Sequence, residues 1–312
     1  MARSLRLILI APTLMAAFLL GACGGDNSPP SVAISTPGAP VVNSDPATDA
    51  LTWFNFRRQQ IGLSVVTRSA TIDVASQGHS DYQKDNNTIT HTEIAGKPGF
   101  IGVDLRARLL AAGITIPDPN SIGFAGYAFG EVISSANNNV GENAAEDLIG
   151  AIYHRYVIFE PMYKQAGAGV ATIKNGATYI TVDFLAIGLD SGLATGAFVH
   201  YPFTDQTQVP TDVLTDNEEP DPVPNQNQAG YPISVHSNTD NTLIVTSFTV
   251  KPRGGANLSV QLLTSDLDVH TPSSAAAIIP LAPLTAATTY DVHFVGTVAS
   301  VAADQTWSFT TK

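Results

Sequence analysis

VATIKNGATYITVDFLA, residues 170–186, predicts a β-hairpin near the middle of this chain. Asn175 and Gly176 favour the tight two-residue turn of a hairpin, because both tolerate positive φ angles. After the turn, residues alternate at the period of a strand. The alternation places Ile180, Val182 and Phe184 on one face and Tyr179, Thr181 and Asp183 on the other.

The segments before the hairpin have helical spacing. Two apolar faces recur every three to four residues, formed by Ala50, Trp53, Phe54 and Ile61 and by Ile72, Ala75, His79 and Tyr82. Residues 144–156 predict a third helix. Helices followed by paired strands favour the α+β class, so we expect an α+β domain over residues 47–190.

The chain after residue 197 has a different pattern. Short alternating runs, separated by turn-forming residues, read TLIVTSFTV, NLSVQLLT, TTYDVHFVG and QTWSFTT. This pattern is typical of a β-sandwich, which we expect over residues 197–312. The acidic stretch DNEEPDP, residues 216–222, is expected to be a solvated linker, with a calcium site as the alternative.

Residues 1–23 read as a secretory signal, with Arg3 and Arg6 before an apolar stretch at 7–20 and small residues after it. The apolar stretch is shorter than the roughly 20 residues that a bilayer requires. The segment ends in Leu-Gly-Ala-Cys, which resembles the lipobox of bacterial lipoproteins and implies lipidation of Cys23. An ordinary signal peptide is the alternative.

Cys23 is the only cysteine, so the exported chain has no internal disulfide. A lipid on Cys23 would make the membrane a partner without a spanning helix. Gly24, rather than aspartate, follows the cysteine and favours the outer membrane or cell surface. Residues 24–46 contain five prolines and no periodic apolar face, which predicts a flexible tether.

The charge balance argues against a nucleic-acid partner. The chain has 15 basic and 27 acidic residues, and loss of the signal removes two of the basic ones. An acidic surface repels the phosphate backbone of nucleic acids.

The first domain resembles the CAP superfamily (cysteine-rich secretory, antigen 5 and pathogenesis-related proteins), whose domain is also called SCP. The segment around Asn55 and Arg58 is similar to the family opening L-x-x-[IV]-N-x-x-R-x-x-x-G-L. Residues 72–91 are similar to the helix and loop that carry the first site histidine. Matches to later family segments follow in order at 99–114, Gly130-Glu131-Val132-Ile133, Tyr153-His154-Arg155, and Gly167 with Gly169. The resemblance implies a CAP-type α-β-α sandwich.

The C-terminal part resembles the Ig-like modules of bacterial surface proteins. PLAPLTAATTYDVHFVGTV followed by QTWSFTT is similar to their last hairpin and closing strand. Together, the two resemblances imply a CAP-type α-β-α sandwich followed by an all-β Ig-like sandwich. Such modules act as spacers or adhesive units, and a stabilising appendage is the simplest role for this one.

The CAP resemblance implies a central cleft formed by His91, Glu131 and His154. Gly141-Glu142-Asn143 matches the family motif G-E-N literally, but relatives have twenty-odd residues between that glutamate and the second histidine. Glu131 precedes His154 by 23 residues and fits this spacing. The second glutamate of animal and plant members has no counterpart, because Glu142, Glu146 and Asp147 are expected on a helix surface.

Two imidazoles and a carboxylate form a common zinc ligand set that leaves one coordination position open. His91, Glu131 and His154 are therefore candidate ligands for a divalent metal such as zinc, although the same residues also suit a hydrogen-bonded cluster without metal. The sequence favours an exported, lipid-anchored envelope protein that binds a lipid, peptide or glycan. A zinc-dependent hydrolase is the alternative.

The remaining histidines are expected to serve no shared site. His79 is expected in the core or half-exposed, with a place in the cleft as the alternative. The others are expected at the surface, and they are His200, His236, His270 and His293. Beside His154, Arg155 is expected to pair with Glu160, and the apolar residues around them are expected to pack in the core.

Overall fold

The computed structural model describes residues 38–121, 124–174, 176–190 and 192–312. The expected signal 1–23, the lipidation site Cys23 and most of the 24–46 tether lie outside these residues. The described chain from Pro40 onward forms one compact unit. In this part of the chain, no helix has the length and apolar character needed to cross a bilayer.

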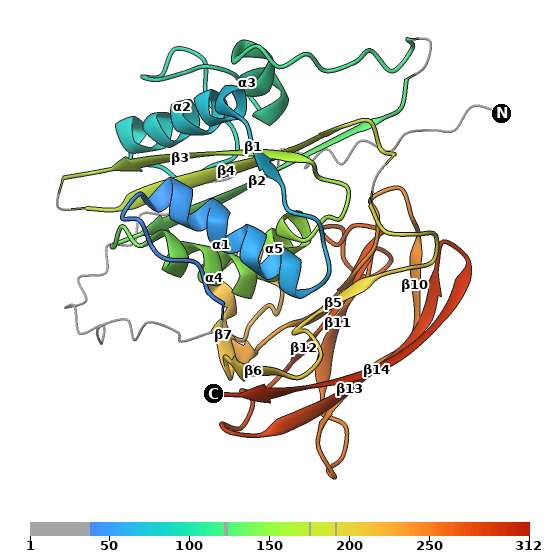
Figure 1. The fold of residues 1–312 in the computed structure, drawn as a ribbon. Coiled ribbons are helices and arrows are strands. Elements are labelled where there is room, and N and C mark those ends of the chain that lie inside the picture. Colours follow the sequence, from blue (N-terminus) through green and yellow to red (C-terminus); the bar gives the residue numbers. More distant parts are fainter. Residues whose placement is uncertain (1–37, 122–123, 175, 191) are drawn as a thin grey trace. The chain divides into compact units, whose positions relative to one another are not determined.

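The strand pairing of the predicted hairpin is confirmed and forms the centre of the first sheet (Figure 1), whereas Asn175 of the predicted turn lies outside the described residues. β3 (Gln165–Thr172) pairs antiparallel with β4 (Thr178–Ile187) over the whole length of β3. β2 (Tyr127–Ala136) adds antiparallel to the other side of β4, and the short β1 (Thr67–Arg68) runs parallel to β3. The strand order is β1-β3-β4-β2.

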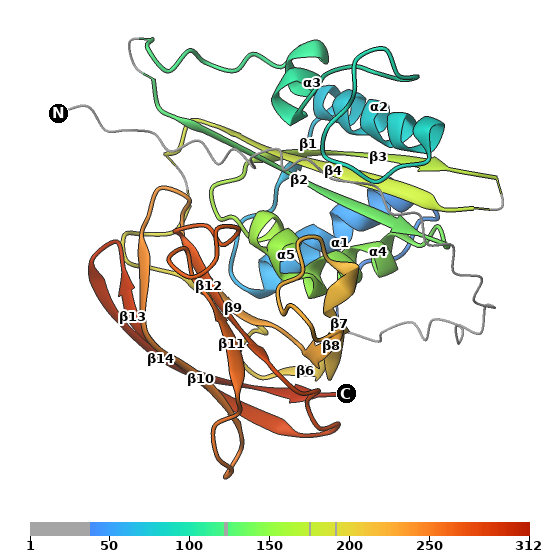
Figure 2. The same ribbon diagram turned by 180° about the vertical axis from the view of Figure 1, so that it is seen from behind.

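Helices lie on both faces of this sheet (Figures 1 and 2). They are α1 (Pro46–Gln60), α2 (Ala70–Asn86), α3 (Leu105–Ala111), α4 (Gly141–Gly150) and α5 (Ile152–Ile158). α2 and α3 cover one face, whereas α1, α4 and α5 lie on the other. The single helix predicted over 144–156 is interrupted at Ala151, whose extended conformation (ψ 120°) separates α4 from α5.

α2 lies directly on β3 because β3 has glycines where the helix crosses it. A Cβ on Gly169 would lie 2.3 Å from the Cα of Gln77. At this close distance the Asp73 carboxylate accepts a hydrogen bond from Ala168 N at 2.8 Å, and the Gln77 amide bonds both N–H and C=O of Val170. Side chains of α2 therefore satisfy backbone groups at the outer edge of β3.

Both faces of β4 are buried, including the one that carries polar residues. Ser76 Oγ donates to Asp183 Oδ2 at 2.8 Å, and Ser80 and Gln83 hydrogen-bond to Thr181 Oγ1 at 3.0 and 3.2 Å. These bonds join α2 to the sheet. The polar face of the predicted strand is thus an interior contact surface, on which Thr181 and Asp183 each bond to side chains of α2.

The second part consists almost wholly of strands. One sheet has the order β10-β13-β14-β6, a second has β11-β12-β9-β5, and a small pair is β7-β8. Their bounds are β5 (Val199–Tyr201), β6 (Gln206–Val209), β7 (Asp212–Leu214), β8 (Gln228–Gly230), β9 (Ile233–His236), β10 (Leu243–Pro252), β11 (Val260–Leu263), β12 (Ala275–Pro280), β13 (Thr289–Val298) and β14 (Val301–Thr311), with a 3-10 turn η1 (Thr215–Asn217). Aromatic contacts join the two larger sheets, such as His200 of β5 stacked on Trp307 of β14 at 4.2 Å.

The expected fold class, α+β with a CAP-type α-β-α sandwich followed by an all-β Ig-like sandwich, is wrong for this chain. Its described residues form fourteen strands in four sheets and only five α-helices, so the protein is mostly β. Most of the strands follow residue 197, and the helical part is not a self-contained sandwich, because Ile152 and Tyr156 of α5 pack in one hydrophobic cluster with residues of the β-rich part such as Leu263. A helix expected to complete the first layer is thus packed into the second core.

Candidate functional site

His91 and Glu131 lie side by side in the structure. His91 belongs to the loop between α2 and α3, Glu131 lies on β2, and His91 Nδ1 is 2.9 Å from Glu131 Oε1. The His91 side chain is 45% exposed, whereas that of Glu131 is only 4% exposed. An exposed imidazole is therefore fixed at one nitrogen by a buried carboxylate.

Arg108 of α3 forms hydrogen bonds to both residues of this pair. Its guanidinium donates to Glu131 Oε2 at 2.5 Å and to the His91 carbonyl at 3.1 Å, and its side chain is fully buried. Burial alone would raise the pKa of Glu131, but the charge of Arg108 and the His91 hydrogen bond outweigh it and hold the pKa well below its usual range. Glu131 is therefore ionised, and its charge is matched.

Asp183 is a neighbour of Glu131 that the sequence prediction missed. The two residues are directly opposite each other in the β2–β4 register, which places their side chains on the same face. Burial, followed by the charge of Glu131, raises the pKa of Asp183 well above its usual value. Asp183 Oδ1 has no hydrogen-bond partner among the described residues. The sequence signal that could have identified Asp183 is a single acidic residue within a strand of otherwise apolar and neutral polar residues.

His79 and Glu93 organise the loop that carries His91. His79 Nδ1 is 2.8 Å from Glu93 Oε1, and His79 Nε2 is 2.7 Å from the Thr90 carbonyl. Glu93 Oε2 also accepts from the backbone N–H groups of Ile101 and Gly102. Both side chains are fully buried, so His79 belongs to the core and positions His91 indirectly.

His154 has a different partner from the one that the family resemblance implies. It lies on α5, on the opposite face of the sheet from α2 and α3, and its Nδ1 is 3.1 Å from Glu218 Oε1. The Glu218 carboxylate also accepts the backbone N–H groups of Ile152, Tyr153 and His154 at 2.7, 2.6 and 3.2 Å. Glu218 is buried, so the expectation of a solvated linker at 216–222 is wrong at this residue.

Arg155 does not pair with Glu160 as expected. Its guanidinium lies over the rings of Tyr201 and Tyr231, at 5.0 and 4.9 Å from their centroids. It donates to backbone carbonyls, including that of Pro232 at 2.7 Å. Arg155 therefore joins α5 to the β-rich part through aromatic and carbonyl contacts.

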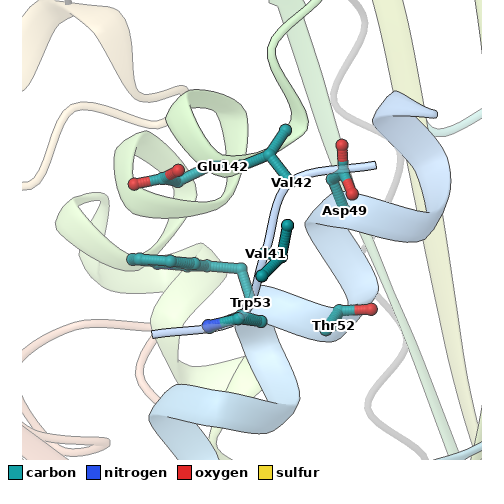
Figure 3. A pocket seen from close by; sticks show the side chains of 7 residues that line it. Val41, Val42, Asp49, Thr52, Trp53 and Glu142 are labelled. Atoms are coloured by element: carbon teal, nitrogen blue, oxygen red, sulfur yellow. The ribbon is translucent and has the colours of Figure 1, made fainter. Parts of the chain in front are cut away.

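Of the three acidic residues expected on a helix surface, Glu146 is held between elements. On α4, Glu146 accepts hydrogen bonds from two residues of α1, Trp53 through Nε1 and Arg57 through Nε, the latter at 2.6 Å. Glu142 lines a shallow surface depression with Val41, Val42 and Trp53, shown in Figure 3. It lies on the face of the first sheet that α1 and α4 cover, whereas the loop with His91 follows α2 on the other face.

Of the histidines expected at the surface, one is buried and another is half-buried. His236 is buried, with its Nε2 2.8 Å from Ser234 Oγ, and burial lowers its pKa well below the usual value. His200 is half-buried and stacks on Trp307, and burial lowers its pKa to about 4. His270 and His293 are exposed as expected.

The residues expected to bind zinc do not fit it in this arrangement. Both carboxylate oxygens of Glu131 are already bonded, one to His91 and the other to the Arg108 guanidinium. His154 Nδ1 contacts Glu218, and no group of three or more metal-binding side chains occurs within the described ranges. The Glu131 carboxylate is paired with the Arg108 guanidinium, which occupies the oxygen that a metal ion would need.

Comparisons with known proteins give partial likenesses. No family model and no curated protein matches this chain. An extracellular SCP-domain protein of Bacillus anthracis is 19% identical over 45% of this chain, with a TM-score of 0.35. An outer surface protein of Borrelia burgdorferi is 13% identical over 44% of this chain, with a TM-score of 0.34. The matches span 39% and 89% of those two chains, and likeness at this level assigns neither a fold nor a function to the protein.

Proposed function

We propose that the protein is an exported, envelope-bound binding protein whose ligand contacts His91. The observation that carries this proposal is the half-exposed imidazole held by a buried Glu131–Arg108 pair. His91 donates a hydrogen bond from Nδ1–H to the ionised Glu131 carboxylate. The other ring nitrogen, Nε2, is therefore available to a ligand. In neutral histidine this nitrogen accepts a hydrogen bond, and in protonated histidine it donates one.

A binding role accounts for the buried charges better than packing does. Burying an ion pair brings little net stability compared with apolar residues of similar volume. A fully buried arginine that bonds both Glu131 and the His91 carbonyl instead fixes the direction of one exposed side chain. Preorganised polar groups of this kind give ligand sites their specificity.

The loop around His91 favours a ligand that is partly apolar. Four large apolar side chains on this loop are exposed, and they are Ile89, Ile94, Phe100 and Val103. Apolar side chains exposed on the same loop as a fixed polar group can add apolar contact area for a ligand. A lipid, a peptide or a glycan with an apolar part has the matching chemistry.

The envelope location and the CAP relationship belong to the same proposal. They rest on the signal-like residues 1–23, on Cys23 as the lipidated residue, and on the order of the motifs around His91, Glu131 and His154. A lipid at Cys23 would place the His91 site at a membrane surface, where lipids, peptides and cell-wall glycans are all present.

The test is a screen of the full-length protein against three ligand classes, read by native mass spectrometry and isothermal calorimetry. The probes are phosphatidylethanolamine micelles, a random heptapeptide pool and chitin oligosaccharides. We expect at least one class to bind, with an affinity that falls about tenfold or more in His91→Ala, since a good polar contact is worth about 1.5 kcal/mol.

His293→Ala is the matched control, because His293 is an exposed histidine that also contacts one carboxylate, that of Asp304. This variant should bind as the wild type does. Equal affinities of wild type and His91→Ala for every probe would contradict the proposal.

A further inference from the structure

β2 forms an open edge of the first sheet (Figure 2). It is ten residues long, and among the described residues it pairs only with β4. The bond from Gly188 N to the Gly126 carbonyl begins the β2–β4 ladder. Because antiparallel bonds alternate every second residue, the N–H and C=O groups of Tyr127 and Phe129 point away from β4.

Other strand edges in the described chain are protected. β1, β5, β6 and β11 have two to four residues, and the outer edge of β3 is bonded by Asp73 and Gln77 of α2. The long edge strand β10 has a bulge and ends in Lys251 and Pro252. Proteins use short strands, bulges, lysine and proline to prevent unwanted pairing at an edge. β2 has none of these features.

The accessible part of the edge leads to His91. Residues 127–130 of β2 are half-buried, whereas residues 131–133 are buried. The rings of Tyr127 and Phe129 are stacked at 5.9 Å and 8°, and Phe124 lies edge-on to Tyr127 at 6.0 Å. A row of aromatic rings therefore accompanies the outward-facing backbone groups, which bond to no other described residue, up to Glu131, which contacts His91.

We propose that an extended peptide binds this edge as an added strand along residues 127–130, with one end at His91. The inference rests on the proposed function, whose ligand contacts His91, and it names the ligand class. Backbone groups of Tyr127 and Phe129 supply two donors and two acceptors, and only a peptide among the three ligand classes repeats N–H and C=O at the spacing of a strand. Alternate side chains of the peptide pack on the aromatic rings.

The experiment selects heptapeptides from a random phage-displayed library on the immobilised full-length protein. The enriched peptide is then synthesised in two forms, one unmodified and one N-methylated at alternate residues. We expect the N-methylated form whose blocked amides face β2 to bind about tenfold or more weakly, because each methyl group removes a donor and adds bulk. Hydrogen exchange of the Tyr127 and Phe129 amides should slow when the unmodified peptide binds.

A matched pair of variants isolates the backbone contribution. Phe129→Pro and Phe129→Ala both remove the ring, but only proline also removes the outward N–H, and proline is tolerated on an edge strand at such a position. We expect Phe129→Pro to bind the peptide about tenfold more weakly than Phe129→Ala does.

Two outcomes overturn the peptide proposal. One is a library that yields no enriched peptide, and the other is a peptide that binds equally well after N-methylation without protecting the Tyr127 and Phe129 amides. If a lipid or glycan then binds in a His91-dependent manner, the proposed function stands and only the peptide inference fails. If His91→Ala alters the binding of no probe, the proposed function fails as well.

Discussion

At the scale of single residues, the site depends on how buried charges are matched. Glu131 keeps its charge because Arg108 is within hydrogen-bond distance, whereas its neighbour Asp183 faces Glu131 and accepts a hydrogen bond from the neutral Ser76 Oγ. Two adjacent carboxyls with one cation favour a state in which one is ionised and the other is protonated. The His91 anchor therefore depends on the protonation of a residue that does not touch His91.

Asp183→Asn tests this arrangement through the pH dependence of stability. The pKa of Asp183 is raised in the folded state, so its contribution to stability is present at acid pH and is lost as the pH rises towards the folded pKa. Asparagine resembles the protonated acid and does not titrate. We expect urea unfolding to show the variant more stable than wild type at pH 8 by at least about 1 kcal/mol, and the difference to shrink towards pH 4.

Asp266→Asn is the control for this measurement, because the same change of side chain is made at an exposed aspartate. A difference between Asp183→Asn and wild type that stays constant from pH 4 to pH 8 would show that Asp183 is already ionised in the folded protein.

At the scale of elements, the contact between α2 and β3 sets the position of the loop that follows α2. Gly167 and Gly169 allow the helix to approach the strand, and the Asp73 and Gln77 side chains then bond to the strand edge. The helix ends at Asn87, whose left-handed conformation (φ 48°) turns the chain into the loop that carries His91. The helix–strand contact therefore positions the site.

Gly169→Ala is expected to destabilise the protein through this contact. The added Cβ would meet the backbone of α2 at 2.3 Å, which forces the helix away from the strand. Such overpacking costs about 1–3 kcal/mol, and we expect a lower melting temperature in circular dichroism. Gly150→Ala is the control, because its Cβ would have ordinary contacts of 3.7 Å or more. Equal melting temperatures of the two variants would contradict the close packing.

At the scale of the whole molecule, α5 joins the first sheet to the β-rich part. Its apolar residues lie in a shared hydrophobic cluster, its Arg155 contacts the rings of two tyrosines, and its N-terminal N–H groups donate to Glu218. Glu218 and Arg155 are both buried, so neither contact is a loose surface bridge. The compact unit from Pro40 onward is consistent with this shared core.

Arg155→Lys tests whether the two cores unfold together. Lysine keeps the charge but cannot make the flat contact with Tyr201 and Tyr231 or the same set of carbonyl bonds. We expect one calorimetric transition in both proteins, with the variant less stable by about 2 kcal/mol. Two separate transitions in the wild type, with only one shifted by the substitution, would show that the cores are independent.

Some features of this protein follow from its sequence alone. The β3–β4 hairpin follows from residue alternation, and α1 and α2 follow from helical spacing, because both patterns arise between residues close in the chain. The burial of His79 also agrees with its place on the apolar side of α2. The boundaries expected at 47–190 and 197–312 stay predictions, as does a cleft that joins His91, Glu131 and His154.

Tertiary structure decides the remainder. The partner of His154 is Glu218, 64 residues away, and Arg155 reaches the Pro232 carbonyl, 77 residues away. Local patterns describe which face of an element is apolar but not which distant surface covers it, so α5 could not be assigned to the second core from its spacing. For the same reason, the sequence predicts strands at 170–186, whereas only the assembled sheet shows that β2 has an open edge beside His91.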